Sequence, residues 1–472
     1  MIPTKPSYIA GRPVDNGAWL DVRNPWNGEV SGRVALITPA QLEEAIQAHL
    51  TPAEPLTRHA RSIILERAAN ALQARREEFA RIITSESGLC LAETRYEVGR
   101  ACDVLHFSAM EALRDDGQTF SCDISAQGKA RKIFTLREPL ALIAAITPFN
   151  HPLNQVAHKI APAVAAGAPM ILKPSEKTPL SAAALAELLY EAGLPGRLLS
   201  VIHGGLDEIT RPLIRDPRVE LVTFTGSAKV GHEIARTAGY KKLCLELGGH
   251  SPLIVLEDAD LDLAAKLACE GCFRNSGQRC TAVRRILVQE SVRADFTARF
   301  EKLAATYLCG DPLDEATKVG TVIDEAAAAM LEEAVRQAVS VGAKILLGGE
   351  RRGAVMPPTI LADVPRHARI ANEECFGPLA PILSVRDLDD AIQLANATAY
   401  GLSSGIVTRS MDSAIRAVKG IRAGTVNVNE IPGYRLELSP FGGVKDSGMG
   451  IKEGVIEAMR FMSTVKTFSL PW

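Results

Sequence analysis

From residue 139 onward, short apolar runs alternate with helical patterns, and this alternation constrains the fold more than any other feature of the sequence. LALIAAIT (140–147), APMILK (168–173), LLSVI (198–202) and LVTFTG (221–226) are typical of strands buried on both faces, and a helical pattern follows each of them. Parallel strands joined by crossover helices produce this rhythm. The sequence therefore predicts an α/β protein with a doubly wound nucleotide-binding sheet.

A second α/β unit is expected after Gly248-Gly249, because strand-like and helical segments continue to alternate as far as residue 428. Before residue 121 there are two long helical patterns, at about 58–87 and 90–115. Residues 121–138 alternate like a hairpin, and the C-terminal tail alternates as a closing strand would. The 472 residues are too many for one small core. The predicted units are a nucleotide-binding domain (1–120 and 139–246), a second α/β domain (247–440) and a small β element that bridges subunits (121–138 and 453–472).

The bulk properties exclude several classes of partner. A net charge of −2 gives no electrostatic reason to expect nucleic acid or membrane partners. No apolar run approaches the ~20 residues of a membrane span, and no secretory signal opens the chain. The nine irregularly spaced cysteines are typical of reduced cytoplasmic thiols, and Cys269 and Cys272 lack the further ligands of a metal site. We therefore expect a cytoplasmic protein without a metal.

One cysteine stands in an unusual context. Cys280 follows a small polar run, Asn275-Ser276-Gly277-Gln278, and a cation, Arg279. Such a turn can present a thiol at a surface, and a neighbouring cation lowers a thiol pKa. The alternative is that Cys280 is a small apolar filler.

The expected nucleotide site lacks the usual fingerprint. No G-x-G-x-x-G motif opens a helix after any predicted strand, but FTGSAKVG (224–231) joins a strand to a helix whose N-terminus can hold a phosphate. Thr-Gly-Ser is also an ordinary helix cap. The Lys173-Pro-Ser-Glu176 segment places a cation and a carboxylate at another strand's carboxyl end, where ligands bind in such sheets. A solvated surface pair is the alternative for Lys173 and Glu176.

Seven motifs in order resemble the aldehyde dehydrogenase superfamily nearly end to end. They are Pro148-Phe-Asn-His-Pro152, Lys173-Pro-Ser-Glu176, Phe224-Thr-Gly-Ser227, Glu246-Leu-Gly-Gly249, Gly277-Gln-Arg-Cys280, Glu373-Glu-Cys-Phe-Gly-Pro378, and Pro440-Phe-Gly-Gly443 with Ser447-Gly448. The resemblance implies that family's fold of two doubly wound α/β domains with a bridging β element. It also implies NAD(P)-dependent oxidation of an aldehyde by a homodimer or homotetramer.

The resemblance also assigns roles to matching residues. Cys280 would attack the aldehyde, the Asn150 side chain and the Cys280 backbone N–H would stabilise the oxyanion, and Glu246 would activate the hydrolytic water. The cofactor contacts implied are Thr147, Pro148, Lys173, Ser175, Glu176, Gly226, Ser227, Gly248, Glu374 and Phe376. A carboxylate at Glu176 would repel a 2′-phosphate, which favours NAD, with NADP as the alternative.

By the same resemblance, the substrate tunnel would be lined by Arg100, His151, Arg279, Thr281 and Arg435. Three arginines and a histidine around one tunnel are costly to bury without an anion, and guanidinium groups bind oxyanions well. Each has an alternative: Arg100 could pair with Glu97 or Asp103, Arg279 could serve only the thiolate, Arg435 could pair with Glu437, and His151 could be packing.

We therefore expect a short aldehyde with a multiply charged anionic head group, and the pattern most resembles phosphonoacetaldehyde dehydrogenases. Non-phosphorylating glyceraldehyde-3-phosphate dehydrogenase and succinate semialdehyde dehydrogenase are the rival activities. A catalytically silent structural relative would lack Cys280, Glu246 or Asn150, and all three are present. A coenzyme-A-acylating relative would usually lack the carboxylate at Glu246.

Overall fold

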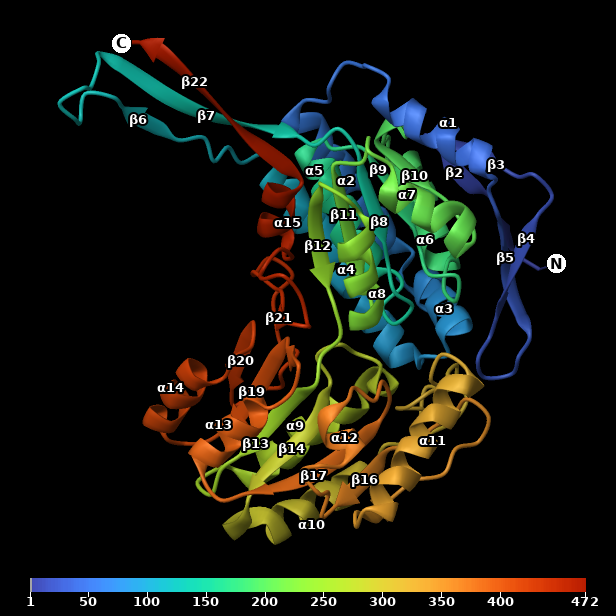
Figure 1. Ribbon diagram of the computed structural model, residues 1–472. Helices are drawn as coiled ribbons and strands as arrows, with labels where there is room; N and C mark the ends of the chain where they lie inside the picture. Colours follow the sequence, from blue (N-terminus) through green and yellow to red (C-terminus); the bar gives the residue numbers. More distant parts are fainter. Residues whose placement is uncertain (1) are drawn as a thin grey trace.

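Two seven-stranded sheets, one above the other in Figure 1, make up most of the molecule. The computed structural model describes residues 2–472. The chain runs from the upper sheet into the lower one directly after Glu246 and enters the second sheet at Ser251. The expected α/β fold with two doubly wound sheets is confirmed.

The first sheet is parallel apart from one antiparallel edge. Its strands, in spatial order, are β12 (Lys242–Glu246), β11 (Leu221–Thr225), β8 (Ile143–Ile146), β9 (Met170–Lys173), β10 (Leu199–Val201), β2 (Ser7–Ile9) and β3 (Arg12–Val14). From β8 the chain winds first through β9 and β10 and then returns to the other side through β11 and β12. Ligands bind at such a switch point, beyond the carboxyl ends of the strands.

Helices cover both faces of the first sheet because its strands are apolar on both. Ile143 and Ala145 of β8 face one core, and Leu142, Ala144 and Ile146 face the other. The first face packs on α2 (Arg58–Ala74), α3 (Arg76–Ser87), α4 (Leu91–Ala112), α5 (Asn154–Ala166), α6 (Leu180–Glu191) and α15 (Val455–Phe461). The second face packs on α1 (Pro39–Leu50), α7 (Arg211–Arg215) and α8 (Ala228–Thr237).

The second sheet is built in the same way. Its strands are β15 (Lys344–Leu347), β16 (Thr359–Ala362), β17 (Leu379–Val385), β14 (Val283–Gln289), β13 (Ser251–Val255), β19 (Ser403–Val407) and β20 (Thr425–Val428). One face packs on α9 (Leu261–Phe273) and α10 (Arg293–Ala304). The other packs on α11 (Glu325–Ser340), α12 (Arg369–Asn372), α13 (Leu388–Asn396) and α14 (Met411–Gly420).

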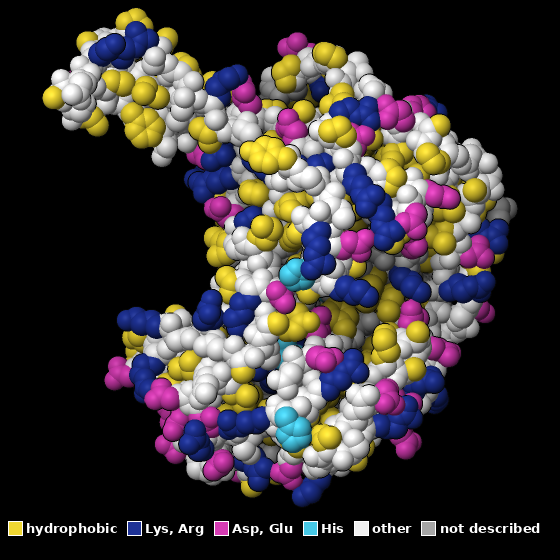
Figure 2. Space-filling view, in the orientation of Figure 1, with side chains coloured by type: hydrophobic (Ala, Val, Ile, Leu, Met, Phe, Trp, Pro, Cys, Tyr) yellow, Lys and Arg dark blue, Asp and Glu magenta, His cyan; other side chains and the backbone are white. Residues whose placement is uncertain are grey.

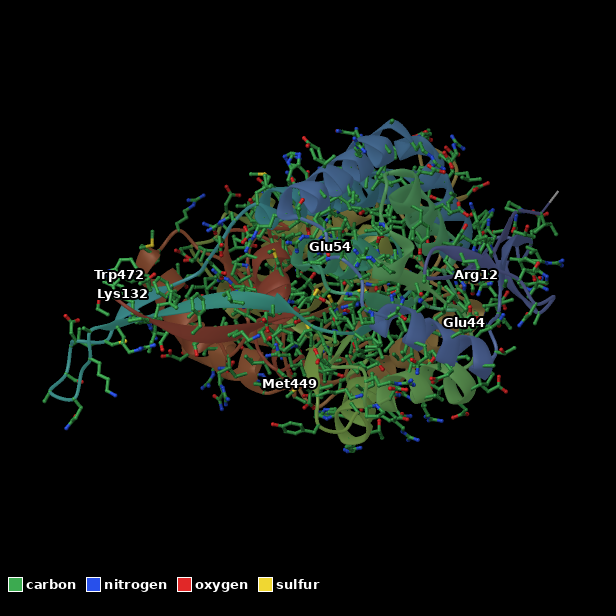
Figure 3. The ribbon with its side chains drawn as sticks, turned by 90° about the horizontal axis from the view of Figure 1, so that it is seen from above. Arg12, Glu44, Glu54, Lys132, Met449 and Trp472 are labelled. Carbon is green, nitrogen blue, oxygen red and sulfur yellow. The ribbon has the colours of Figure 1, made fainter. Side chains whose placement is uncertain are left out.

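A three-stranded antiparallel arm projects from the body at the upper left of Figure 1. It consists of β6 (Thr119–Ser121), β7 (Arg131–Pro139) and the C-terminal strand β22 (Ser463–Pro471). Hydrophobic side chains are visible on it in Figure 2, and Figure 3 shows Lys132 beside Trp472, whose ring lies 4.0 Å from the Lys132 ammonium. Trp472 is 74% exposed and Val465 is 55% exposed, so the arm carries apolar surface that this chain does not cover.

Smaller elements complete the fold. They are the sheet of β1 (Thr4–Lys5), β5 (Val30–Ala35) and β4 (Trp19–Arg23), the pair β18 (Tyr400–Gly401) and β21 (Val444–Lys445), the 3₁₀ turns Gly196–Leu198, Arg274–Gly277 and Glu290–Val292, and the π turn Leu206–Thr210. Within residues 2–472, no helix combines the length and the apolar character needed to cross a bilayer.

The expected strands and helices occur close to their expected positions, with two differences. The single helical pattern over 58–87 is two helices, because Arg75 leaves the helical conformation (φ −102°, ψ 21°) while the apolar spacing continues across it. The hairpin expected over 121–138 has strands that end at Ser121 and begin again at Arg131, so residues 122–130 form a longer loop.

A buried carboxyl group on α3, whose pKa burial raises to about 8, caps the N-terminus of α6. Glu86, which is fully buried, accepts hydrogen bonds from the backbone N–H groups of Leu180 (2.6 Å) and Ser181 (3.1 Å). Without it, these donors would be buried and unpaired. We expect Glu86→Ala to lower the free energy of unfolding by about 2–3 kcal/mol, measured by denaturant titration. Glu77→Ala is the matched control. Glu77 lies on α3 like Glu86, but it is exposed and pairs with Arg95 of α4, so its loss should change stability little.

Candidate active site

The candidate site lies where the carboxyl ends of the first sheet meet the amino ends of the second. Asn150 follows β8, Glu246 ends β12, and Cys280 stands just before β14. The Asn150 side-chain amide donates a 2.8 Å hydrogen bond to the carbonyl oxygen of Gln278, two residues before the cysteine. The three residues expected to carry the chemistry are therefore brought to one interface between the sheets.

The loop that presents Cys280 has an uncommon backbone. Asn275, Ser276 and Gly277 all have positive φ (57°, 51° and 68°), which costs energy at the two non-glycine positions. A Cβ on Gly277 would lie 2.3 Å from the carbonyl oxygen of Gly377, so only glycine fits there. The Asn275 side chain holds the turn by donating to the carbonyls of Asn150 (3.0 Å) and Gln278 (3.3 Å).

A buried cation fixes this loop to its surroundings. The Arg284 guanidinium donates to the carbonyl oxygens of Gly277 (2.6 Å) and Arg279 (3.2 Å), and to that of Gly377 (2.7 Å). It also lies 5.3 Å from the centre of the Phe376 ring. Arg284 is 1% exposed, so these bonds form in a low dielectric, where they are strong. The expectations from sequence did not include Arg284, although a cation four residues after the cysteine was visible.

The charge state of Cys280 differs from expectation. Burial raises the pKa of the Cys280 thiol to about 11, and the main opposing influence is the positive charge of Arg435. Arg279 instead donates to the carbonyl oxygens of Glu270 (2.6 Å) and Gly271 (2.9 Å) near the C-terminal end of α9. The expectation that Arg279 lowers the pKa of the thiol is therefore wrong: adjacency in sequence did not place the guanidinium beside the sulfur.

Glu246 is a buried carboxyl group with neither oxygen hydrogen-bonded. Burial, together with the negative charge of Glu453, raises its pKa well above the usual value. Glu453 itself accepts a 3.0 Å hydrogen bond from the Lys159 ammonium, and this cation lowers the pKa of Glu453 although burial opposes it. Sequence reasoning missed Glu453 and Lys159, since an acidic residue after a glycine-rich loop carries no distinguishing pattern.

Two of the expected substrate residues share one carboxylate. Arg100 on α4 and His158 on α5 both donate to Glu437, one to each carboxylate oxygen, and Arg435 lies 3.8 Å from the same carboxylate. The Arg435 guanidinium also stacks 3.9 Å above the Phe441 ring. Burial opposes ionisation of Glu437, yet His158 and Arg100 hold its pKa far below the usual range. Arg100 thus pairs with Glu437 rather than with Glu97 or Asp103.

The other expected substrate residues are placed differently. The His151 ring lies 3.7 Å from Glu97, a carboxylate that caps α5 through the N–H groups of Leu153 and Asn154. Thr281 packs against Gly433, where an added Cβ would come within 2.4 Å of the Thr281 hydroxyl. This contact holds the 433–435 segment, and with it Arg435, beside the cysteine loop. The Arg279 guanidinium is turned away from Arg100 and Arg435, because it is bound at the end of α9.

The expected cofactor residues are found on adjoining loops. Lys173 ends β9 and donates to Glu176 (3.0 Å), whose side chain is half exposed. Ser227 caps α8 by accepting the N–H of Val230, and Gly226 lies against the Phe224 ring, where a Cβ would clash. Near them, Thr147 keeps a buried hydroxyl without a partner, while Pro148 and Ser175 stand on the adjoining loops after β8 and β9.

A second group of these residues adjoins the cysteine loop. The Glu374 carboxylate accepts the N–H of Gly249 (3.0 Å), and a Cβ on Gly248 would strike it. Burial raises the pKa of Glu374, with Arg284 opposing. The Phe376 ring meets Phe149 edge-on at 5.9 Å. These features fit a dinucleotide: close-approach glycines, a helix N-terminus, carboxylates for ribose hydroxyls and an aromatic face. Across residues 2–472, no group of side chains is arranged to hold a metal ion.

Comparison with known proteins agrees with this geometry. The model of the aldehyde dehydrogenase family matches residues 13–468. The 3-sulfolactaldehyde dehydrogenase of Priestia aryabhattai is 38% identical over 455 residues, which cover 95% of each chain. Aldehyde dehydrogenase 21 from Physcomitrella patens, solved with the reaction product succinate, superposes with a TM-score of 0.96 at 36% identity over 100% of this chain and 98% of that chain.

A third relative was solved with its cofactor. The NADP-dependent glyceraldehyde-3-phosphate dehydrogenase of Bacillus halodurans, complexed with NADP, gives a TM-score of 0.95 at 34% identity over 100% of this chain and 99% of that chain. All three similarities extend over nearly the whole length of both chains.

The raised pKa of Cys280 gives a direct test of the resting state. Because thiolate is the species that reacts, alkylation of Cys280 by iodoacetamide should be slow at pH 7 and should rise about tenfold per pH unit up to pH 9.5 without a plateau. The reaction is followed by mass spectrometry of the peptide that contains Cys280, with Cys280→Ala as the control for the other thiols. A plateau below pH 8.5 would contradict a pKa of about 11.

Proposed function

This chain belongs to the aldehyde dehydrogenase family and is an oxidoreductase that acts on aldehydes with NAD or NADP, and we propose that its substrate is a short aldehyde with an anionic head group. The observation that carries the proposal is Arg435. This guanidinium is 9% exposed, its charge acts on the pKa of Cys280, and its Nη1 atom is buried without a hydrogen-bond partner. A buried donor of this kind is costly unless a ligand accepts from it.

In the proposed reaction, Cys280 attacks the aldehyde carbon and forms a thiohemiacetal. The Asn150 amide, held at the cysteine loop by its bond to Gln278, has a second N–H available for the developing oxyanion. The Cys280 backbone N–H is the other donor. Loss of one such donor costs roughly 3–4 kcal/mol of transition-state stabilisation. When bound, the nicotinamide ring supplies the hydride acceptor, and the Cys280 adduct becomes a thioester.

Glu246 is the proposed base for hydrolysis of the thioester. Burial and the charge of Glu453 raise the pKa of Glu246, and a carboxyl group whose pKa is raised toward the working pH is a more effective proton acceptor. Lys159 and Glu453 form a buried ion pair close enough to influence Glu246, and Lys159 also donates to the Thr223 hydroxyl (2.9 Å). We assign this pair to setting the charge that Glu246 experiences.

The proposed cofactor contacts follow from the same positions. Lys173 and Glu176 would bind the adenosine ribose, Gly226 and Ser227 the pyrophosphate, and Glu374 the nicotinamide ribose. Thr147, Pro148, Ser175, Gly248 and Phe376 would complete the walls. The Glu176 carboxylate, which is exposed and restrained only by Lys173, favours NAD over NADP because it would repel a 2′-phosphate.

Phosphonoacetaldehyde is the substrate that we propose first. The guanidinium groups of Arg100 and Arg435 and the ring of His158, which surround Glu437, are available to a phosphonate head group. Relatives named for 3-sulfolactaldehyde and glyceraldehyde 3-phosphate, and the one solved with succinate, support an anionic head group without choosing among these. Succinate semialdehyde is the second candidate. Glu437 already neutralises one of the two positive charges of Arg100 and Arg435, and the remaining charge favours a single carboxylate.

We further propose that the chain forms a homodimer or homotetramer through its arm. The exposed apolar side chains of β7 and β22 support this, because an isolated apolar sheet is unfavourable in water.

Replacing the guanidinium tests the anionic substrate. Arg435→Met keeps an apolar side chain over Phe441 and removes the charge. We expect the KM for phosphonoacetaldehyde to rise about tenfold to a hundredfold, since charge-assisted hydrogen bonds contribute about 1.5–3 kcal/mol. The KM for propanal, the neutral control, should change far less, whereas kcat falls for both aldehydes because the charge of Arg435 lowers the pKa of Cys280. A wild-type kcat/KM that is higher for propanal than for phosphonoacetaldehyde, succinate semialdehyde and glyceraldehyde 3-phosphate would overturn the proposal.

The role of Glu246 is tested by pre-steady-state kinetics. Glu246→Gln has nearly the same shape but cannot accept a proton from water. We expect a burst of reduced cofactor equal to the concentration of active sites, followed by slow turnover limited by thioester hydrolysis. Cys280→Ala should give neither burst nor turnover while still binding the cofactor. An unchanged steady-state rate in Glu246→Gln would remove this residue from the base role.

A further inference from the structure

Arg435 and its neighbour His158 each keep one buried polar atom without a hydrogen-bond partner. These atoms are Nη1 of Arg435 and Nδ1 of His158. The two side chains touch, since Nη2 of Arg435 lies 3.5 Å from Nε2 of His158, and their exposures are 9% and 0%. Buried polar atoms are usually satisfied, so two unpartnered atoms on side chains that touch, one of which acts on the pKa of Cys280, point to a ligand that accepts from both.

The bond to Glu437 decides how His158 can meet such a ligand. Glu437 is ionised, because His158 and Arg100 overcome the effect of burial on its pKa, so it can only accept hydrogen bonds. Nε2 of His158 must therefore carry the proton that it donates to Glu437. In a neutral imidazole this leaves a lone pair on Nδ1, which repels an anion. Only the imidazolium ion can donate to Glu437 and to an anion at the same time.

The charges around His158 show when the imidazolium would form. Glu437 favours it, Arg435 opposes it, and Glu453, which also favours it, is largely neutralised by Lys159. Without a ligand, burial lowers the pKa of His158, so the ring is neutral near pH 7. The subsite then contains two guanidinium groups and one carboxylate, with a net charge of +1. That charge balances a carboxylate or a sulfonate, but a phosphonate dianion needs one further positive charge.

We propose that His158 determines the specificity of the anion subsite: it takes up one proton when a doubly charged phosphonate or phosphate head group binds, and donates Nδ1–H to that head group. Glu437 is the positioning residue that fixes the ring and stabilises its protonated form. This inference rests on the proposed function and identifies which anionic aldehydes the same site distinguishes. Singly charged head groups bind without the proton.

The sign of the pH dependence follows from the proton uptake. A dianion that binds together with a proton loses affinity as the pH rises, by about tenfold per unit at most. A singly charged head group of the same shape does not show this loss. Between pH 7.5 and 9 a phosphonate is mainly a dianion and a sulfonate remains a monoanion. The wild-type ratio of kcat/KM for phosphonoacetaldehyde to that for sulfoacetaldehyde, with saturating NAD, should therefore fall across this range.

A matched variant isolates the histidine. His158→Gln keeps an amide N–H that can reach Glu437, and it removes the Nδ1 donor and the titration. At pH 7 we expect its KM for phosphonoacetaldehyde to be about tenfold higher than that of the wild type, with kcat and propanal oxidation little changed. The ratio of wild-type to variant kcat/KM should approach one by pH 9. In this ratio the ionisation of the phosphonate and of Cys280 cancels.

The outcomes separate the two proposals. A phosphonate-to-sulfonate ratio that is flat with pH, or equal losses for phosphonoacetaldehyde and propanal in His158→Gln, would overturn the role of His158 while an anion preference stood. A wild-type enzyme that prefers propanal would overturn the proposed function and this inference together. Should His158→Gln fail to fold, Glu437→Gln and the wild-type ratio test the same prediction, because Gln at position 437 cannot stabilise the imidazolium.

Discussion

The buried guanidinium of Arg284 is the interaction on which the geometry of the site depends. A buried cation without a counter-ion is unfavourable unless its donors find acceptors. Arg284 donates to two carbonyl oxygens just before Cys280, those of Gly277 and Arg279, and to one in the Glu374–Pro378 loop. The Gly277 carbonyl belongs to the turn in which three consecutive residues, Asn275 to Gly277, adopt positive φ. The strained turn and the cation therefore stabilise each other. Together they place the thiol at a fixed position relative to Glu374 and Phe376.

Three buried carboxyl groups near the thiol show how environment sets protonation. Glu246 has no hydrogen-bond partner and its pKa is raised, whereas Lys159 lowers the pKa of Glu453, and His158 and Arg100 lower that of Glu437. The residue type is the same in each case, and the difference lies in which cation each one meets. Of these three groups, Glu246 is the one without a cation partner, and base catalysis is assigned to it.

Much of the fold and part of the site could be predicted from the sequence. Parallel strands and their helices were predicted because buried strands need continuous apolar runs, and Cys280, Glu246 and Asn150 were identified by their motifs. Side-chain directions were not predictable: Arg279 adjoins the cysteine in sequence, yet its guanidinium turns to the end of α9. His158 and Lys159 were missed because they lie in the otherwise apolar helix α5, where a single polar residue resembles a satisfied core residue. Their partners, Glu437 and Glu453, come from a segment nearly 300 residues later, which no local pattern can connect.

Arg435 joins substrate recognition to the chemistry, because its charge lowers the pKa values of both Cys280 and Glu246. An anionic head group bound to Arg435 would cancel that field and would make thiolate formation harder just when it is needed. The proposed protonation of His158 resolves the conflict, since the added positive charge balances the second negative charge of a dianion. Arg435 then retains part of its influence on the thiol. A single buried carboxylate, Glu437, thus determines both which charge the site accepts and how much of the field at Cys280 remains after the substrate is bound.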